Sequence, residues 1–440
     1  MPMNPHEKSL LRSALAVLAM GIWVSPAFCG DIPGLTGSGT AWLPPLADPH
    51  GNALAGSLGA WSLMAHGEAL LRYTRQNANH TGRWEASSVG ERGGQKIDGP
   101  AWFMLQALRP LPAGASLGLR TMLSLDPLTE GRPGYPLLFQ SGEGLIDRQH
   151  AHDMFMELSA TLLMPVGRRQ AAFLYFGLPG EPALGPVAFM HRPAARENPD
   201  APLSHHMQDA SHITFGVATV GWILGNTKID ASVFRGQEPD TDRLDIEAPR
   251  FDSYSLRMSR HLRPDLSAQA SWGFLNAVRM AGMPAGMRLR RLTASVDYSR
   301  PFSGGTRFSA ALLYGMNDHA GMDHPGPSAT HSLGSEAQYD RGKQSFWTRG
   351  EALQRMGYEL DLPGRSFERY WVRAFTAGTS RSLFRSCGME LLAGAQGTVH
   401  SAPDLEEDYG DHPLAWQAFL RLRPWSPRWD GPGGHHHLSW

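Results

Sequence analysis

The most constraining feature of this sequence is an alternation of apolar and polar side chains with a period of two. In residues 59–73, Trp61 and Tyr73 fall on one side of an extended chain, whereas Glu68 and Arg72 fall on the other. An apolar face with an aromatic residue near each end, opposite a charged face, is typical of a strand that crosses a membrane. A half-buried strand of a soluble sandwich would also alternate, so one segment does not decide between them.

Repetition of the pattern favours the membrane strand. Residues 116–125 set leucines against Arg120, and residues 291–298 set Val296 and Tyr298 against charged and hydroxyl side chains. Such inner faces are too polar for a packed soluble core. The alternation predicts about sixteen strands, at residues 60–73, 100–110, 115–126, 153–164, 170–178, 211–223, 227–236, 252–261, 266–277, 288–299, 306–316, 333–341, 345–355, 367–381, 388–398 and 414–423.

Two alternatives stay open at this stage. The alternation is weakest in 100–110, 333–341 and 367–381, so about fourteen strands is the second count. Residues 153–164 also fit an amphipathic helix. Either reading leaves the all-β class unchanged.

The connections between these strands alternate in length. Residues 111–114, 165–169, 224–226 and 262–265 are short, and the spans between them, such as 179–210, are long. Bacterial outer-membrane barrels have an even number of strands, short periplasmic turns and long extracellular loops. The sequence therefore predicts a transmembrane antiparallel β-barrel over residues 60–423.

The segments outside the barrel have their own signatures. Residues 1–30 are expected to be a cleaved signal peptide, because two basic residues precede an uncharged apolar run over 13–25. Residues 31–59, rich in glycine and proline, are expected in the periplasm or in the lumen, and residues 424–440 form a tail that contains histidines. These features predict export to the outer membrane, with its lipid as a partner.

Bulk properties exclude other classes. A net charge of −1 gives no basic field for nucleic acid. Beyond the leader no run reaches the roughly 18 apolar residues of a membrane-spanning helix. A barrel of about sixteen strands leaves a water-filled lumen unless something fills it, and residues 179–210 are long enough either to fold inward or to extend outward. The oligomeric state stays open.

Histidines concentrate in the long loops. Residues 147–153 and 191–212 flank the fourth and fifth predicted strands, so we expect them to meet above the wall at one rim. Imidazoles with carboxylates suit Zn or Cu(II), and inward-pointing methionines at 154, 190 and 207 would favour Cu(I). The predicted metal ligands are His150, His152, Asp153, His191, His205, His206, Asp209 and His212. The alternative is that these are ordinary polar loop residues, because no single spacing is diagnostic.

The predicted inner wall carries charges of both signs. A wall of one sign would indicate ion selectivity, whereas a mixed wall favours salt bridges that hold the barrel round. The residues expected to face the lumen are Glu68, Arg72, Arg120, Glu157, Lys228, Asp230, Arg257, Asp297, Arg307, Arg349, Glu351, Arg373, Glu390 and Arg421.

Three stretches resemble a known group of proteins. Residues 146–158 (IDRQHAHDMFMEL), 185–216 and 419–424 (FLRLRP) are similar to an uncharacterised family of Gram-negative outer-membrane barrels often encoded beside copper and other heavy-metal efflux genes. The resemblance spans most of the mature chain and implies a barrel fold in a metal-linked context. It brings no reaction and no binding residues.

Two functions follow as hypotheses. The first is a barrel whose outer mouth binds or filters copper or zinc, and the second is a general porin for small solutes. We do not expect an enzyme, because the adjacent Ser211 and His212 would point to opposite faces of a strand and no Gly-x-Ser-x-Gly motif is present.

Overall fold

The computed structural model describes residues 37–48, 53–77, 94–130, 137–140, 152–240, 242–278, 287–319, 329–360, 362 and 364–425. The expected signal peptide, His150 and the tail beyond residue 425 lie outside these ranges. In the described part of the chain, no helix is long and apolar enough to cross a membrane.

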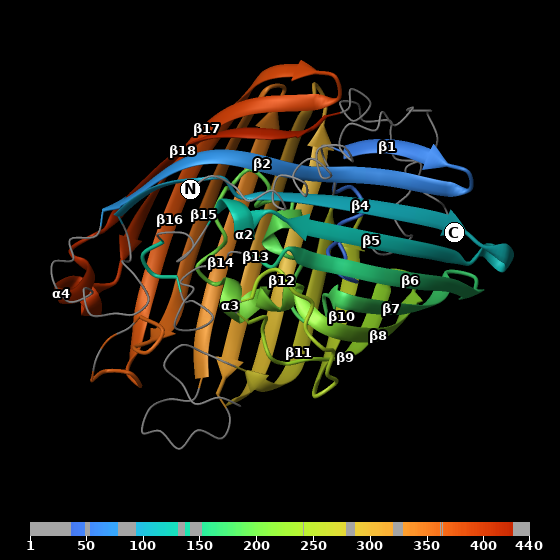
Figure 1. Cartoon of the computed structure of the whole chain (residues 1–440), viewed down its shortest axis with the longest axis horizontal. Coiled ribbons are helices and arrows are strands. Elements are labelled where there is room, and N and C mark those ends of the chain that lie inside the picture. The colour runs from blue at the N-terminus through green and yellow to red at the C-terminus, as the bar shows by residue number, and fades with distance from the viewer. Residues whose placement is uncertain are drawn as a thin grey trace, which may run out of the picture.

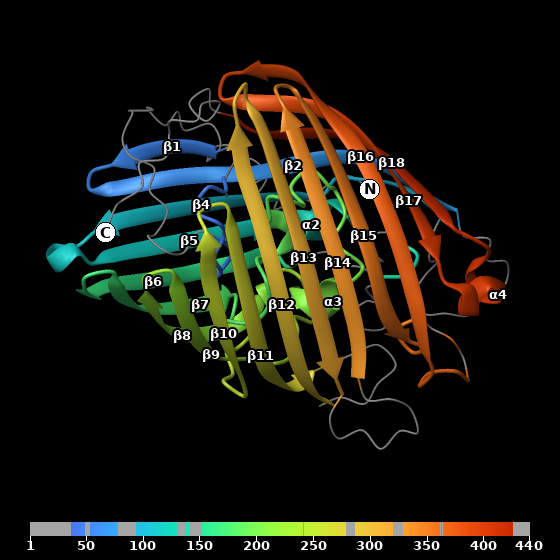
Figure 2. The same cartoon turned by 180° about the vertical axis from the view of Figure 1, so that it is seen from behind.

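Strands make up nearly all of the regular structure (Figures 1 and 2). They are β1 (Ala53–Leu58), β2 (Trp61–Asn77), β3 (Gly94–Asp98), β4 (Ala101–Pro110), β5 (Ser116–Ser124), β6 (Phe155–Gly167), β7 (Gln170–Gly180), β8 (Thr214–Leu224), β9 (Thr227–Phe234), β10 (Ser253–Arg263), β11 (Leu266–Val278), β12 (Met287–Phe302), β13 (Thr306–Asp318), β14 (Ala329–Arg341), β15 (Gln344–Met356), β16 (Arg369–Ser386), β17 (Met389–Ser401) and β18 (Leu414–Pro424). The short helices are η1 (Pro112–Gly114), α2 (Asp126–Thr129), η2 (Phe189–His191), α3 (His205–Gln208), η3 (Ala210–His212), η4 (Pro403–Leu405) and α4 (Glu406–Tyr409).

The strands close into an antiparallel barrel. Each pairs with its neighbours in sequence, and β18 pairs with β2 to complete the ring. β3 and β4 share one register against β2 and form a single wall strand, interrupted at Gly99 and Pro100 because proline has no backbone N–H to donate. With β3 and β4 counted together, the described residues form a ring of sixteen strands, and each of the sixteen predicted strands is present.

One strand was not predicted. β1 pairs with β2 in a hairpin, beyond the end of β18 on the same edge of β2. It lies in residues 31–59, which the alternation did not assign to the wall. Six residues, of which glycine and alanine are half, give too short a pattern to recognise.

The two faces of the wall have opposite character. In β10, Tyr254, Leu256 and Met258 are exposed on the outside, whereas Ser255 and Arg257 are buried inside. Closure of the barrel pairs the backbone groups of neighbouring wall strands without water, as a membrane-spanning structure requires. The apolar outer face suits lipid, and the polar inner face suits water. The short connections gather at one end, called here the turn end, and the long ones at the other, the loop end.

The alternative of an amphipathic helix over 153–164 is excluded, because residues 155–167 are strand as predicted. Two details differ from the sequence predictions. Strand β8 begins at Thr214, so Ser211 and His212 lie in a 3-10 turn and not on the strand. Arg373 is exposed on the outside and not in the lumen, because Val372 takes the inward place in β16.

Candidate channel constriction

The long connection between β7 and β8, residues 181–213, folds into the barrel. Residues 181–209 are all buried or partly buried, and α3 contacts β12, β13 and β14. Figures 1 and 2 show α3 inside the ring of strands from both sides. We call residues 181–213 the inward loop. Its histidines therefore lie in the lumen and not above the rim, where they were predicted.

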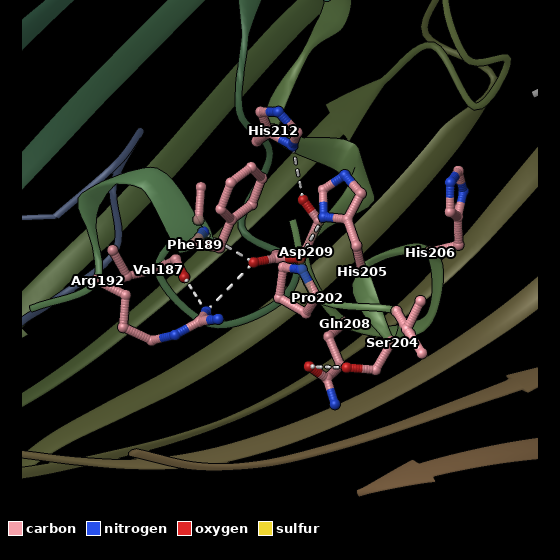
Figure 3. Close-up of polar contacts among 12 residues, drawn as sticks. Val187, Phe189, Arg192, Pro202, Ser204, His205, His206, Gln208, Asp209 and His212 are labelled. Atoms are coloured by element: carbon pink, nitrogen blue, oxygen red, sulfur yellow. Dashed lines mark hydrogen bonds and ion pairs between the residues drawn. The ribbon is translucent and has the colours of Figure 1, made fainter. Parts of the chain in front are cut away.

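Arg192 makes hydrogen bonds both within the inward loop (Figure 3) and to the wall. Its guanidinium donates to Asp209 at 3.2 Å, to the carbonyl of Val187 at 2.7 Å, and to Glu336 of β14 at 2.6 and 3.2 Å. The carboxylate of Asp209 also accepts from the backbone N–H of Phe189 at 2.9 Å. Fully buried charges persist only when paired and hydrogen-bonded in this way. The contacts fold the loop on itself and attach it to the wall.

Glu197 attaches the loop to a second part of the wall, at β18, four strands along from β14. It receives hydrogen bonds from Arg421 at 3.1 Å and from Arg423 at 2.6 Å, both on β18. Burial alone would raise the pKa of Glu197, but Arg423, Arg421 and Arg196 lower it from 4.5 to about 2. The carboxylate is thus ionised and paired at neutral pH.

Asp200 makes a third attachment. It accepts from Arg72 of β2 at 2.9 Å and from the amides of Gln396 and Gln417 at 2.8 Å each. Three strands of the wall thereby converge on one loop carboxylate. Residues 192, 197 and 200 were not predicted as site residues, because the charges in HRPAARENPD (191–200) are equally expected of a loop that faces water.

Wall side chains also bind the backbone of the loop. Arg291 donates to the carbonyl of His206 at 2.7 Å, and Arg257 to that of Gly185 at 3.2 Å. At Gly315 of β13 the loop comes so close that an added Cβ would lie 2.2 Å from the carbonyl oxygen of Met207. The absence of a side chain at Gly315 therefore leaves room for the backbone of the loop.

A second segment, residues 37–48, occupies the turn end of the lumen. Thr40 donates to Asp230 at 2.7 Å and accepts from Arg257 at 2.7 Å. Trp42 stacks on His261 with ring centroids 4.0 Å apart. The segment touches the inward loop, because Ser38 accepts from the backbone N–H of Ala188 at 2.9 Å. Together the two segments narrow the lumen.

Open space remains on the β2–β6 side. One cavity, with about 660 Å³ of space open to solvent, is lined by Glu68, Leu70, Arg72, Pro100, Trp102, Ser124, Asp126, His152, Phe189, Met190, Ala195, Arg196, Asn198, Pro199, Asp200 and Ala201. A second, of about 280 Å³, is lined by Ser38, Met122, Met156, Glu157, Glu181, Ala188, Met190, His191 and His212. Met190 lines both, so the two spaces adjoin.

Four of the predicted metal ligands come together inside the barrel. The ring of His212 lies 5.0 Å from that of His205 and 5.4 Å from that of His152. Asp209 Oδ1 is 2.5 Å from His205 Nδ1, and the Asp209 carbonyl is 2.9 Å from His212 Nδ1. Burial is the main reason that the pKa of His212 lies well below its usual range, and the nearby His205 lowers it further. This imidazole is therefore neutral.

The other predicted ligands lie apart or are engaged elsewhere. Asp153 pairs with Arg243 at 3.1 Å, next to His152 of the group of four, which also contacts Asp126 at 2.9 Å. His191 lies 5.6 Å from the ring of His66, near the second cavity. His206 is buried, and burial holds its pKa well below the usual range. Among the residues that the structure describes, no three or more His, Cys, Asp or Glu side chains are grouped so as to hold a metal ion.

The mixed charges of the inner wall are paired in two ways. Arg349 bonds Glu336 on the neighbouring strand at 3.0 Å, a contact within the wall. Arg421 reaches Glu197 at 3.1 Å, a contact with the loop. Within the described residues the wall charges therefore secure the inward loop as well as the strands.

Three solved structures are similar to this chain over most of its length. OmpF of Salmonella typhi, in complex with daunomycin, is 10% identical; the match covers 84% of this chain and 100% of that chain, with a TM-score of 0.49. An anion-selective porin from Comamonas acidovorans is 12% identical, with coverages of 82% and 99% and a TM-score of 0.45. OprB of Pseudomonas putida is 10% identical, with coverages of 82% and 94% and a TM-score of 0.46. No family model and no curated protein matches the sequence.

Proposed function

We propose that this chain is an outer-membrane channel for small solutes, in which the inward loop and residues 37–48 confine passage to the β2–β6 side. The observation that carries the proposal is the pair of adjoining cavities along that side, in a lumen that the two segments narrow. The apolar outer face supports the membrane location.

The lining of the first cavity suggests what passes. Glu68 and Asp200 stand beside Arg72 and Arg196, so charges of both signs face the same space. Selectivity filters for ions usually present rings of one sign. We therefore expect a narrow path with weak preference between anions and cations.

Planar-bilayer recording of the full chain tests the proposal. We expect small, steady conductance steps and a reversal potential near zero in a salt gradient. Met190→Trp, which adds bulk where the two cavities adjoin, should lower the step size. Met207→Leu, a buried loop change away from both cavities, is the matched control. Absence of conductance in every variant, or equal steps for the Met190 and Met207 variants, would refute the proposed path.

The second candidate function is the handling of copper or zinc by the histidine cluster. The favouring observation is that the Nδ1 atoms of His205 and His212 are engaged by Asp209, an arrangement that orients imidazoles as metal ligands. In this case micromolar Zn or Cu(II) should change the conductance. A His205→Ala, His212→Ala double variant should abolish that response, and steps that are unaffected by metal in the parent chain would eliminate this candidate.

A further inference from the structure

A line of sulfur and nitrogen donors crosses the inner face of four adjacent strands. The pairing registers place His66 of β2 directly opposite Met104 of β4, and Met104 directly opposite Met122 of β5. On β6 the next buried donor is Met156, beside the register shift between β5 and β6. We call these four the thioether row: His66, Met104, Met122 and Met156.

The members of the row are close to one another. Directly opposed side chains have Cβ atoms about 4.5–5.5 Å apart, and His66 Nε2 lies 3.0 Å from Met104 Sδ. Met104, Met122 and Met156 form one buried cluster, against which Met190 of the inward loop packs. Each member of the row is at least nine-tenths buried.

The bulge on β6 brings Met156 into the row. Met156 and Glu157 are consecutive, yet both are buried on the inner side, which the alternation of a regular strand does not allow. Bulges re-aim a side chain at a cost in strand pairing. Here the side chain that is turned inward carries a thioether.

Packing alone is the simpler explanation of the row, since methionine fills irregular gaps. Two observations point beyond it. Among the described residues, three other apolar clusters on the inner face of the wall contain leucine, valine, alanine and aromatic side chains but no methionine, whereas this one contains three methionines. Imidazoles also join the cluster, because His66 contacts Met104 and His191 lies against both His66 and Trp102.

Part of the row borders one of the two cavities. Met122 and Met156 line the smaller cavity together with Met190 and His191 of the inward loop. The loop thus adds a further thioether and imidazole on the side facing the row. A small ion that enters this cavity would meet sulfur donors from the wall and from the loop.

We propose that the thioether row, covered by Met190 and His191, is a binding site for a soft monovalent cation, Cu(I). Thioether and imidazole ligands select Cu(I), whereas hard cations require oxygen donors. The site differs from the histidine cluster, in which the predicted ligands are imidazoles and carboxylates. It does not depend on the proposed conductance, because Cu(I) would bind whether or not solutes pass.

Anaerobic titration of the detergent-solubilised full chain with Cu(I), against a chromophoric Cu(I) chelator, tests the site. We expect one ion per chain and an X-ray absorption spectrum with sulfur scattering. The triple variant Met104→Leu, Met122→Leu, Met156→Leu keeps the apolar volume but removes three sulfur atoms. Its affinity should fall by at least about tenfold, the lower bound seen when even supporting groups around a metal are removed.

Two controls separate ligation from packing. Met207→Leu replaces a buried methionine of the inward loop that lies in another cluster, and it should leave the affinity unchanged. Met122→Leu alone, in case the triple variant does not fold, should weaken binding and reduce the sulfur contribution to the spectrum. The inference is overturned if the parent chain binds no Cu(I), if its spectrum contains no sulfur scattering, or if the Met122 and Met207 variants bind equally.

Discussion

At the scale of single residues, the lumen is organised by buried charged residues, many of which are paired with a residue of opposite charge. Arg192 is fully buried and shared between Asp209 and Glu336. Such a pair adds little net stability over an apolar substitute for both partners, but removal of one partner leaves the other charge buried and uncompensated. The loss of folding stability is therefore large when only one partner of a pair is removed.

The first prediction follows from Arg192. Arg192→Met should lower the free energy of unfolding by about 3–5 kcal/mol, because Glu336 loses its main counter-charge and Asp209 loses one of its partners. Arg263→Met is the control, since Arg263 is 60% exposed in its pair with Asp265, and exposed pairs contribute about 0–1 kcal/mol. Urea unfolding in detergent micelles measures both, and equal losses would contradict the buried network.

The second prediction concerns Glu181, at the start of the inward loop. Burial raises its pKa from 4.5 to about 8, so folding favours the protonated form. The stabilising effect of this proton is complete below pH 4.5 and is lost as pH rises toward about 8. Glu181→Gln, which stays neutral, should flatten the fall in melting temperature over this range. A variant that follows the pH profile of the parent chain would show that Glu181 is not buried as described.

At the scale of elements, the strands were predictable and the loops were not. Alternation is a local property of each strand, and the lipid outside and water inside impose it on every one. The direction of the inward loop depends on partners far away in the chain, such as Glu336, which is 144 residues from Arg192. No local sequence pattern predicts that pairing.

The thioether row is an intermediate case. The predicted connection, residues 111–114, is one residue shorter than the observed connection, 111–115, so the predicted hairpin brings Met104 and Met122 near each other but one residue out of register. The inward turn of Met156 could not be predicted, because it depends on a bulge. The position of Arg373 could not be predicted from its charge either. The side of the wall that it faces depends on which residues of β16 point inward.

A third prediction tests the outer face of an element. Leu312, near the middle of β13, is 59% exposed and points outward. Leu312→Arg should cost roughly 2–4 kcal/mol in a lipid bilayer, as expected for a charge at the midplane. Leu312→Val is the control and should have a small effect. Folding equilibria in lipid vesicles measure both, and a tolerated arginine would place this surface outside the membrane.

At the scale of the whole molecule, the barrel encloses two of its own segments. Residues 37–48 narrow the turn end through Thr40 and Trp42, and the inward loop crosses the middle. The two cavities described above follow the β2–β6 side, where the thioether row also lies. The sequence predicted the size and closure of the barrel, whereas the filling of its lumen required the three-dimensional pairing of charges.

The central claim is that buried ion pairs hold the inward loop across the lumen. Single-channel conductance of Glu197→Gln, compared with the parent chain at neutral pH, tests it most directly. The variant loses the charge that pairs with Arg421 and Arg423, so the loop should detach and the conductance steps should become larger. The parent should show the same enlargement only as pH falls from about 4.5 toward 2, where Glu197 takes up a proton. Equal steps in the two proteins at neutral pH would contradict the claim.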